Sequence, residues 1–238
     1  MEPATPSPPD PLDQVVARVA PTPDRSQVVA VAGPVAVGKS TIAAALADRV
    51  RGQGATVEIV GTDGFLWPNA VLDERGLADR KGEPETYDLD HLAAVIAAAQ
   101  RGQSSLAVPV YSHERYDVLD ERREFDRPDV LVVEGVVALQ RRFGDLGLYV
   151  DAAIDDIEGW FVARMHELVR AAAGDPESFY FGWADLGPAT VTDLAVAVWR
   201  EVNLPNIVEH ITPTAAHADA IGHKGPDHSL REITWTRP

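Results

Sequence analysis

The 238-residue sequence contains no cysteine and very few lysines. The absence of cysteine excludes disulfides, iron–sulfur clusters, thiolate zinc sites and a cysteine nucleophile. No apolar run approaches the roughly 18 residues that a membrane-spanning helix needs. The proline-rich first residues also lack the basic and apolar regions of a signal peptide. We therefore expect a cytoplasmic protein that does not enter a membrane.

Basic residues are outnumbered by acidic ones, and the formal net charge is -16 at pH 7. This balance argues against binding to nucleic acid or to anionic membranes, because phosphate-rich surfaces attract lysine and arginine. It leaves room for one local basic pocket that binds a small anion. Hydrophobic residues make up 45% of the chain, which is ample for the core of one large domain. We predict a single domain over 26–238, after a disordered or short helical segment 1–25.

Apolar runs alternate with helical patterns along the first part of the chain. Short apolar runs without polar alternation are typical of buried parallel strands. They predict strands over 27–32, 56–60, 106–111, 129–133 and 147–150. Helical spacing predicts helices over 12–20, 40–51 and 88–100, whereas 1–11 is expected to be disordered and 62–87 to form a loop. Strands that alternate with helices indicate an α/β fold, with a mostly parallel sheet wound by helices on both faces.

The pattern changes after residue 155. Apolar side chains recur on one helical face at Ile157, Phe161, Met165, Leu168 and Ala172. A second helix is predicted over 189–202, and we assign residues 155–210 to a helical acceptor and lid region. Residues 215–238 are expected to hold two closing strands.

The segment GPVAVGKS at residues 33–40 matches the phosphate-binding loop G-x-x-x-x-G-K-[ST]. Its glycines let backbone N–H groups approach phosphate, Lys39 reaches the β- and γ-phosphates, and Ser40 offers its hydroxyl to Mg²⁺. The predicted nucleotide site comprises Gly33, Val35, Ala36, Val37, Gly38, Lys39 and Ser40. The loop alone does not separate kinases from GTPases, ATPases or switches, but the guanine-reading motif N-K-x-D is absent.

Two carboxylates follow predicted strands, at the sheet edge where parallel α/β folds bind their ligands. Asp63 comes after the strand 56–60, and Glu134 comes directly after 129–133. Together with Lys39 they suit phosphoryl transfer to a hydroxyl, in which Asp63 accepts the proton and Glu134 holds Mg²⁺ alongside Ser40. An aspartate after a strand is also typical of turns and helix caps, which remains the alternative for Asp63.

Several longer stretches resemble bacterial type I pantothenate kinases, within the wider group of uridine kinases and phosphoribulokinases. The stretches are GPVAVGKST, VEIVGTDGFLWPN, ERGLADRKGEPETYD, PVYSHERYDV, DVLVVEG, DPESFY, WREVNLPNI and TPT. The patterns PVYSH-x-x-YDV and TDGF-x-x-PN are specific to the pantothenate branch. The resemblance implies a P-loop kinase fold, ATP as the phosphoryl donor, Mg²⁺, a small-molecule alcohol as acceptor, and a homodimer.

The resemblance also implies roles for individual residues. Thr41, like Lys39 and Ser40, binds the ATP phosphates. Arg164 stabilises the transferring phosphoryl group. The implied catalytic residues are therefore Lys39, Asp63 and Arg164. His228 aligns with a histidine near the adenine. Residues implied at the acceptor are Asp63, Tyr111, His113, Phe161, Met165, Tyr180, Trp183 and Asn203.

Two of these assignments have simpler alternatives. Arg164 is flanked by the apolar stripe of its own helix, along which a long basic side chain can pack. Asn203 stands near the predicted end of a helix, where asparagine is common. Both readings stay open at the level of sequence.

The sequence departs from the family in the acceptor pocket. Phe161 stands where the family has a tyrosine, and Met165, Leu168 and Ala173 stand where it has phenylalanines. We therefore expect an ATP-dependent kinase of a small alcohol, with pantothenate as the best single acceptor. The alternatives are a diverged paralogue that phosphorylates a nucleoside or another alcohol, and a nucleotide-binding regulator without turnover. Histidine spacing gives no support to a metal hydrolase, because H-E-x-x-H is absent.

Overall fold

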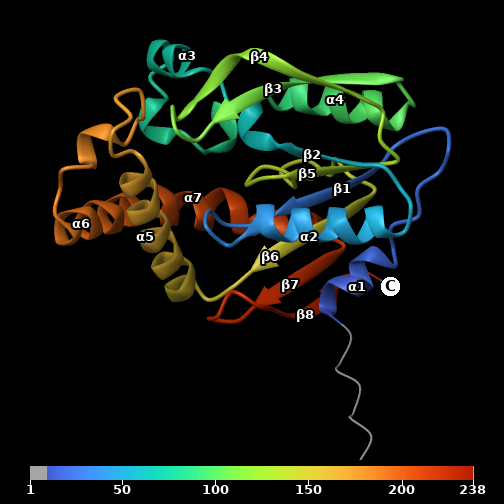
Figure 1. Ribbon diagram of the computed structural model, residues 1–238. Helices are drawn as coiled ribbons and strands as arrows, with labels where there is room; N and C mark the ends of the chain where they lie inside the picture. Colours follow the sequence, from blue (N-terminus) through green and yellow to red (C-terminus); the bar gives the residue numbers. More distant parts are fainter. Residues whose placement is uncertain (1–9, 238) are drawn as a thin grey trace, which may run out of the picture.

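A six-stranded sheet forms the centre of the protein, whose computed structural model describes residues 10–237 (Figure 1). The strand order is β2-β5-β1-β6-β7-β8, and every neighbouring pair is parallel except β7 and β8. The strands are β1 (Gln27–Ala32), β2 (Val57–Gly61), β5 (Val130–Glu134), β6 (Leu146–Asp151), β7 (Ala220–Lys224) and β8 (Leu230–Trp235). The mostly parallel sheet and its two closing strands are therefore confirmed.

Apart from Gln27 at the start of β1 and Glu134 at the end of β5, these two central strands are apolar, because helices cover both faces of the sheet. The helix α2 (Lys39–Gly52) packs against β1, β2 and β5, while α4 (Leu89–Gln100) contacts β1. The Asp88 carboxylate caps α4 by accepting from the His91 N–H at 2.9 Å. These helices agree closely with the predicted ranges.

The predicted strand 106–111 is present, but it does not belong to the central sheet. It lies in β3 (Ser105–Ser112), which pairs antiparallel with β4 (Asp117–Asp126) in a separate ribbon, seen at the top of Figure 1. The strand β4 was not predicted from sequence. Its segment DVLDERREFD is mostly exposed and charged, so it carries none of the apolar signal that marks a buried strand.

The prediction of a loop over 62–87 is wrong, because this segment folds into short helical turns. They are η1 (Thr62–Phe65), α3 (Asn69–Glu74), η2 (Ala78–Arg80) and η3 (Pro84–Thr86). Backbone bonds tie its ends together, from Trp67 N–H to Thr86 O at 2.9 Å and from Asp88 N–H to Phe65 O at 2.7 Å. Turns this short leave no helical periodicity for sequence analysis to detect.

The second half of the chain supplies a helical layer beside the sheet. In α5 (Ile154–Ala171) the predicted apolar face is confirmed, with Ile157, Phe161 and Met165 buried. The predicted helix 189–202 begins as α6 (Pro188–Val198) and continues in short helical turns of different types up to residue 217. These turns are η5 (Trp199–Asn203), α7 (Leu204–Asn206), η6 (Ile207–Ile211) and η7 (Thr212–His217), of which η5 and η6 are π-helical. The linker before α6 contains η4 (Phe181–Trp183).

At the start of the described chain, α1 (Pro11–Val16) is shorter than the predicted helix 12–20. Asp10 caps it, and Arg49 of α2 forms ion pairs with Asp10 and Asp13. The disorder expected for 1–11 falls mostly on residues 1–9, which lie outside the described part. Within residues 10–237, no helix combines the length and the apolar character needed to cross a membrane.

Candidate active site

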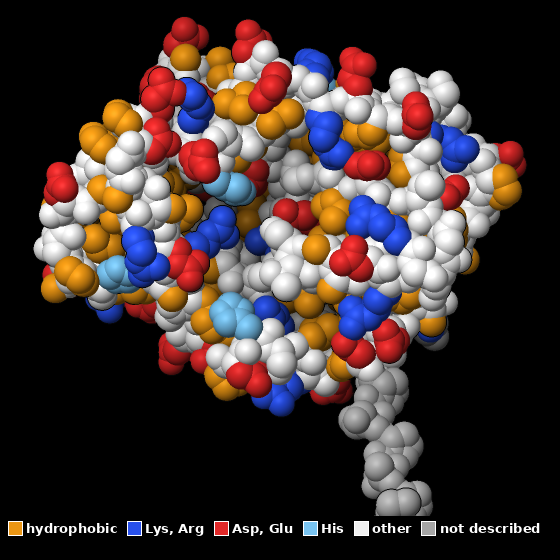
Figure 2. Space-filling view, in the orientation of Figure 1, with side chains coloured by type: hydrophobic (Ala, Val, Ile, Leu, Met, Phe, Trp, Pro, Cys, Tyr) orange, Lys and Arg blue, Asp and Glu red, His pale blue; other side chains and the backbone are white. Residues whose placement is uncertain are grey.

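A cavity of about 640 Å³ opens at the carboxyl ends of β1, β2 and β5, beneath α5 and the helical turns 199–211. Figure 2 shows the hollow near the middle of the face, with basic and acidic side chains gathered around it. Most of the residues predicted for the site line this cavity. They are Val35, Ala36, Lys39, Ser40, Asp63, Tyr111, His113, Glu134, Phe161, Arg164, Met165, Tyr180, Trp183 and Asn203.

The phosphate-binding loop joins β1 to α2, as its sequence predicts. Gly38 is the N-cap of α2 with φ at 89°, and Ala36 also has a positive φ of 61°. A Cβ on Gly33 would lie only 2.3 Å from the Val150 carbonyl oxygen, so this position requires glycine. Successive backbone N–H groups in such a turn, together with the N-terminus of α2, form a site for anionic oxygens.

The side chain of Lys39 is half-buried beside the loop. Its Nζ donates to the Pro34 carbonyl oxygen at 2.8 Å. Burial lowers the pKa of Lys39, while the negative charges of Glu134 and Asp63 oppose this effect. A partly desolvated ammonium that is held by only one carbonyl can transfer its remaining donors to phosphate oxygens. Gly33, Val37, Gly38 and Thr41 support the loop or begin α2 but do not line the cavity itself.

Glu134 ends β5, the strand that lies between β1 and β2. Its neighbours in register are Val31 and Gly61, so its side chain leaves the sheet between the phosphate-binding loop and Asp63. The Ser40 hydroxyl donates to Glu134 Oε1 at 2.9 Å. Hydroxyl and carboxylate oxygens are the hard ligands that Mg²⁺ prefers. Residues 10–237 contain no cluster of three or more acidic or histidine side chains that could hold a metal ion by themselves.

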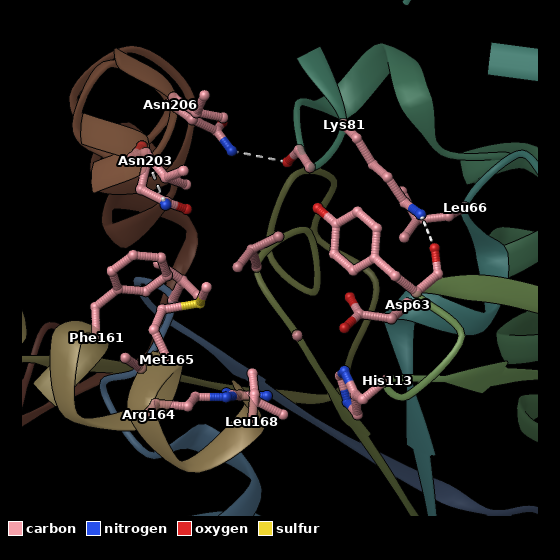
Figure 3. A pocket seen from close by; sticks show the side chains of 18 of the residues that line it. Asp63, Leu66, Lys81, His113, Phe161, Arg164, Met165, Leu168, Asn203 and Asn206 are labelled. Atoms are coloured by element: carbon pink, nitrogen blue, oxygen red, sulfur yellow. Dashed lines mark hydrogen bonds between the residues drawn. The ribbon is translucent and has the colours of Figure 1, made fainter. Parts of the chain in front are cut away.

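Asp63 lies in η1, immediately after β2, and its carboxylate faces the cavity (Figure 3). It does not act as a helix cap, because the N-cap of η1 is Gly61 and no side-chain cap bond is formed. The Tyr87 hydroxyl donates to Asp63 Oδ1 at 3.4 Å, and burial raises the pKa of Tyr87 well above its ordinary value. Tyr87 therefore stays neutral and can donate to the Asp63 carboxylate.

The β3–β4 ribbon supplies an aromatic wall. The ring of Tyr111 meets those of His113 and Tyr116 edge-on, with centroids 5.1 and 6.4 Å away. Phe179, from the linker after α5, lies 4.6 Å from the ring of Tyr116. The Phe179 N–H also donates to the Glu114 carbonyl oxygen at 2.8 Å, so the linker closes onto the tip of the ribbon.

Lys81 lines the cavity beside this aromatic wall, and it was not predicted as a site residue. Its ammonium lies 3.9 Å from the ring centroid of Tyr116 and donates to Asn69 Oδ1 at 2.6 Å. Desolvation lowers the pKa of Lys81 to about 8, although Asp117 and Asp63 raise it in part. Most Lys81 side chains are therefore positively charged at neutral pH, on the side of the cavity that faces α5.

The helix α5 presents Phe161, Arg164, Met165 and Leu168 to the cavity (Figure 3). Arg164 is close enough to Lys39 for its positive charge to lower the pKa of that lysine. Arg164 thus lies at the cavity, and its catalytic role stays a prediction. Tyr180 and Trp183 extend the wall, with rings edge-on at 6.1 Å.

Two predicted residues, Asn203 and His228, make side-chain hydrogen bonds or ring contacts with residues that were not predicted for the site. The Asn203 side chain lines the cavity and donates weakly from Nδ2 to its own helix, at Val198 O over 3.4 Å. His228 lies outside the cavity lining, in the turn between β7 and β8, with φ at 63°. Its ring stacks on that of Trp160, with centroids 3.7 Å apart, and its Nδ1 is 3.3 Å from Lys224 Nζ.

The cavity also contains residues that sequence reasoning did not select, among them Lys81, Tyr87, Tyr116 and Asn206. All four lie inside stretches that carry the family resemblance: RKGEPETYD, PVYSHERYDV and WREVNLPNI. Polar residues in those stretches could therefore have been selected from the sequence. The sequence did not show that 62–87 folds into turns, and it is this folding that brings Lys81 and Tyr87 to the site.

Comparison with known proteins agrees with this arrangement. The model of the phosphoribulokinase/uridine kinase family matches residues 28–163. A pantothenate kinase of Sorangium cellulosum is 40% identical over 226 residues, which cover 90% of this chain and 73% of that protein. A pantothenate kinase of Corynebacterium diphtheriae is 41% identical over 216 residues, covering 87% and 70%. A solved structure from Silicibacter sp. TM1040, described as a fructose transport system kinase, has a TM-score of 0.67 at 26% identity over 83% of this chain and 90% of that chain.

Proposed function

The chain belongs to the phosphoribulokinase/uridine kinase family, and from this premise we propose that it transfers the γ-phosphoryl group of ATP to the primary hydroxyl of pantothenate. The relatives named above as pantothenate kinases support this acceptor. One observation carries the proposal: Lys39, Asp63, Glu134 and Arg164 all line a single cavity. That cavity has room for a nucleotide phosphate chain and a small alcohol side by side.

The transfer forms a bond between the acceptor oxygen and the γ-phosphorus and breaks the bond to the oxygen that leaves with ADP. Bound Mg²⁺ and ATP supply the activated phosphoryl group. Lys39 and the N-terminus of α2 offset the charge of the phosphates, and Arg164 stabilises the charge on the transferring group. Asp63 orients the acceptor hydroxyl and takes its proton as the new bond forms.

Ser40 and Glu134 are the residues that would hold Mg²⁺, directly or through water. Their 2.9 Å hydrogen bond brings two hard oxygen ligands to one point at the end of the phosphate-binding loop. Thr41 in the first turn of α2 and His228 beside Trp160 are proposed on the nucleotide side.

The acceptor side fits a molecule with both apolar and polar groups. Phe161, Met165, Tyr180 and Trp183 offer an apolar and aromatic wall for the branched dimethyl end of pantothenate. Tyr111, His113 and Asn203 offer polar atoms for its hydroxyl, carbonyl and amide groups. Lys81 gives this side a positive charge that suits the carboxylate of the acceptor.

A different small alcohol is the second candidate, and the side chains Met165 and Leu168 favour it. They are flexible and apolar at positions where the family resemblance expects phenylalanine, so they reshape the wall that grips the acceptor. A nucleotide-binding regulator without turnover is a weaker alternative, because a regulator does not need the proton acceptor Asp63 at the cavity.

The test is ADP release by the purified protein with ATP and Mg²⁺, offering pantothenate beside a panel of nucleosides and other primary alcohols. Asp63→Asn serves as the blank, and Asp73→Asn, on the exposed face of α3, is the matched control. We expect pantothenate-dependent turnover in the wild type and in Asp73→Asn, with a loss of about 100-fold or more in Asp63→Asn.

Turnover of another alcohol but not of pantothenate would replace the proposed acceptor while keeping the kinase. Turnover of none of the alcohols would instead favour the regulator.

We also propose that the protein is a cytoplasmic homodimer. Light scattering in solution should then give twice the mass of one chain, and a monomer would contradict this assembly.

A further inference from the structure

The side chain of Asn206 occupies an unusual place, between two π-helical turns. The turns η5 and η6 flank the short α7, and their wider winding is a feature that often occurs at functional sites. Asn203 and Asn206 are three residues apart, so they share one face of this wall, and both reach the cavity (Figure 3). Asn206 lies at the point where the wall meets the segment 78–87 across the cavity.

The orientation of the Asn206 carboxamide follows from its partner. Its Nδ2 donates to the Gly82 carbonyl oxygen at 2.9 Å, drawn as a dashed line in Figure 3. A carbonyl oxygen can only accept, so the nitrogen of the amide must face Gly82 and the oxygen must face away from it. This bond also ties the 78–87 segment to the helical wall, where His210 Nε2 lies 3.7 Å from Glu83 Oε2.

The remaining oxygen has no partner. Asn206 is only 8% exposed, and its Oδ1 makes no hydrogen bond with any residue of 10–237. A buried acceptor without a partner destabilises the folded protein, so such groups are rare and call for a water, an ion or a ligand that satisfies them. Three other buried polar atoms lack partners in this part of the chain, namely Thr62 Oγ1, Arg127 Nη1 and Trp199 Nε1. None of those residues lines the cavity, whereas Asn206 does.

We propose that Asn206 Oδ1 accepts a hydrogen bond from the alcohol substrate, which makes Asn206 a specificity-determining residue of the acceptor site. The inference rests on the proposed function. The matching group is a neutral donor away from the reacting hydroxyl: in pantothenate, the secondary hydroxyl or the amide N–H. The Asn206 oxygen then accepts from the substrate, while its nitrogen keeps the 78–87 segment in place through the bond to Gly82.

This arrangement predicts selectivity as well as affinity. A substrate that lacks the donor leaves the buried oxygen unpaired, and a site built on hydrogen bonds rejects such an analogue strongly. A residue that only held the segment 78–87 in place would weaken the binding of all acceptors equally. The preference between an acceptor and its donor-less analogue therefore separates the two roles.

The experiment compares pantothenate with two analogues, one lacking the secondary hydroxyl and one methylated on the amide nitrogen. Asn206→Leu keeps the approximate volume and removes both polar atoms, and Asn206→Ala replaces it if the leucine variant does not fold. We expect the KM for pantothenate to rise about tenfold with little change in the KM for ATP. The preference for pantothenate over one of the analogues should fall by a similar factor, and the analogue affected identifies the donor.

Two further variants sharpen the test. Asn206→Asp keeps an oxygen toward the substrate but cannot donate to Gly82, so it should retain the preference although turnover falls. Gln140→Leu is the matched control, because the Gln140 amide also donates to a backbone carbonyl of this wall, His210 O at 2.8 Å, yet lies outside the cavity lining. It should leave both the KM and the preference unchanged.

The outcomes separate this inference from the proposed function. Wild-type turnover of pantothenate with an unaltered preference in Asn206→Leu overturns the inference alone. An equal loss of preference in Asn206→Asp and Asn206→Leu also overturns it, since the oxygen would then be irrelevant. If the wild type uses a different alcohol, the proposed acceptor is wrong. The preference for that alcohol over its analogue without the donor, compared between wild type and Asn206→Leu, then decides the inference. A protein that phosphorylates no alcohol overturns both.

Discussion

The hydroxyl of Ser40 donates a hydrogen bond of 2.9 Å to Oε1 of Glu134. This contact joins the first turn of α2 to the end of β5, two elements that are about ninety residues apart in the chain. It brings the predicted Mg²⁺ ligands together at the one place where the phosphate-binding loop, Asp63 and the acceptor cavity meet.

Glu134→Gln should weaken the dependence of the reaction on Mg²⁺. The amide retains the size of the side chain but loses the charge that balances the cation, so the apparent Mg²⁺ affinity should fall by about 10–100-fold. A titration of turnover against Mg²⁺ measures the effect. Glu74→Gln, on the exposed face of α3, is the control and should titrate as the wild type does. An unchanged Mg²⁺ titration in Glu134→Gln would remove Glu134 from the metal site.

Lys39→Ala should abolish phosphoryl transfer while the protein stays folded. The ammonium is partly desolvated, has a lowered pKa and, within residues 10–237, bonds only to a loop carbonyl, so removing it does not strip the core of packing. We expect turnover to fall by about 1000-fold, within the range for the loss of a charge that stabilises a transition state. Circular dichroism during heating should show a Tm close to that of the wild type. Unfolding at room temperature would mean that Lys39 supports the loop instead.

Arg164→Ala should lower kcat more than it raises the KM for the acceptor. The guanidinium lies at the cavity near Lys39, where a contact that tightens as charge builds on the phosphoryl group lowers the barrier specifically. Steady-state kinetics with both substrates varied separates kcat from KM. Arg170→Ala, from an exposed position on the same helix, is the matched control. If kcat is unaltered in Arg164→Ala, this arginine packs along α5 and takes no part in transfer.

Binding of an anionic acceptor should weaken as the pH rises through about 8. Desolvation depresses the pKa of Lys81 to about 8, so its ammonium is present below that pH and is lost above it. The nearby Tyr116 has a pKa raised to about 12 and stays neutral over this range. The KM for pantothenate should therefore increase between pH 7 and pH 9, and a bound carboxylate should shift this transition upward.

Lys81→Met tests the origin of that pH dependence. The variant keeps the length and apolar stem of the side chain but carries no charge at any pH. Its KM should be high already at pH 7 and nearly flat up to pH 9. A variant whose KM still rises through pH 8 would show that another group controls acceptor binding.

The catalytic end of the sheet was predictable because its signals are local. The loop from Gly33 to Ser40 has a sequence pattern of its own, and Asp63 and Glu134 directly follow apolar strands. Parallel strands bring their carboxyl ends to one edge, so the meeting of these residues follows from their positions alone. The structure brings them to one cavity, as expected.

The acceptor side was less predictable because its residues come from segments without a regular pattern. Lys81 lies in the turns between η2 and η3, and Tyr116 lies between the two strands of a ribbon whose second strand is charged and exposed. Neither segment shows the periodicity of 2 or 3.6 residues on which sequence interpretation depends. The family resemblance named Asn203 in the wall but not Asn206.

The sequence by itself determined the α/β fold, the phosphate-binding loop and the two carboxylates, since these depend on hydrophobic periodicity and on residues close together in the chain. Only the tertiary structure decided that 62–87 folds into turns and that 106–111 leaves the central sheet for a ribbon. It alone placed the Asn206 amide nitrogen against Gly82, leaving the oxygen unpaired. Contacts between segments more than a hundred residues apart are set by how the layers pack, and no local pattern encodes that packing.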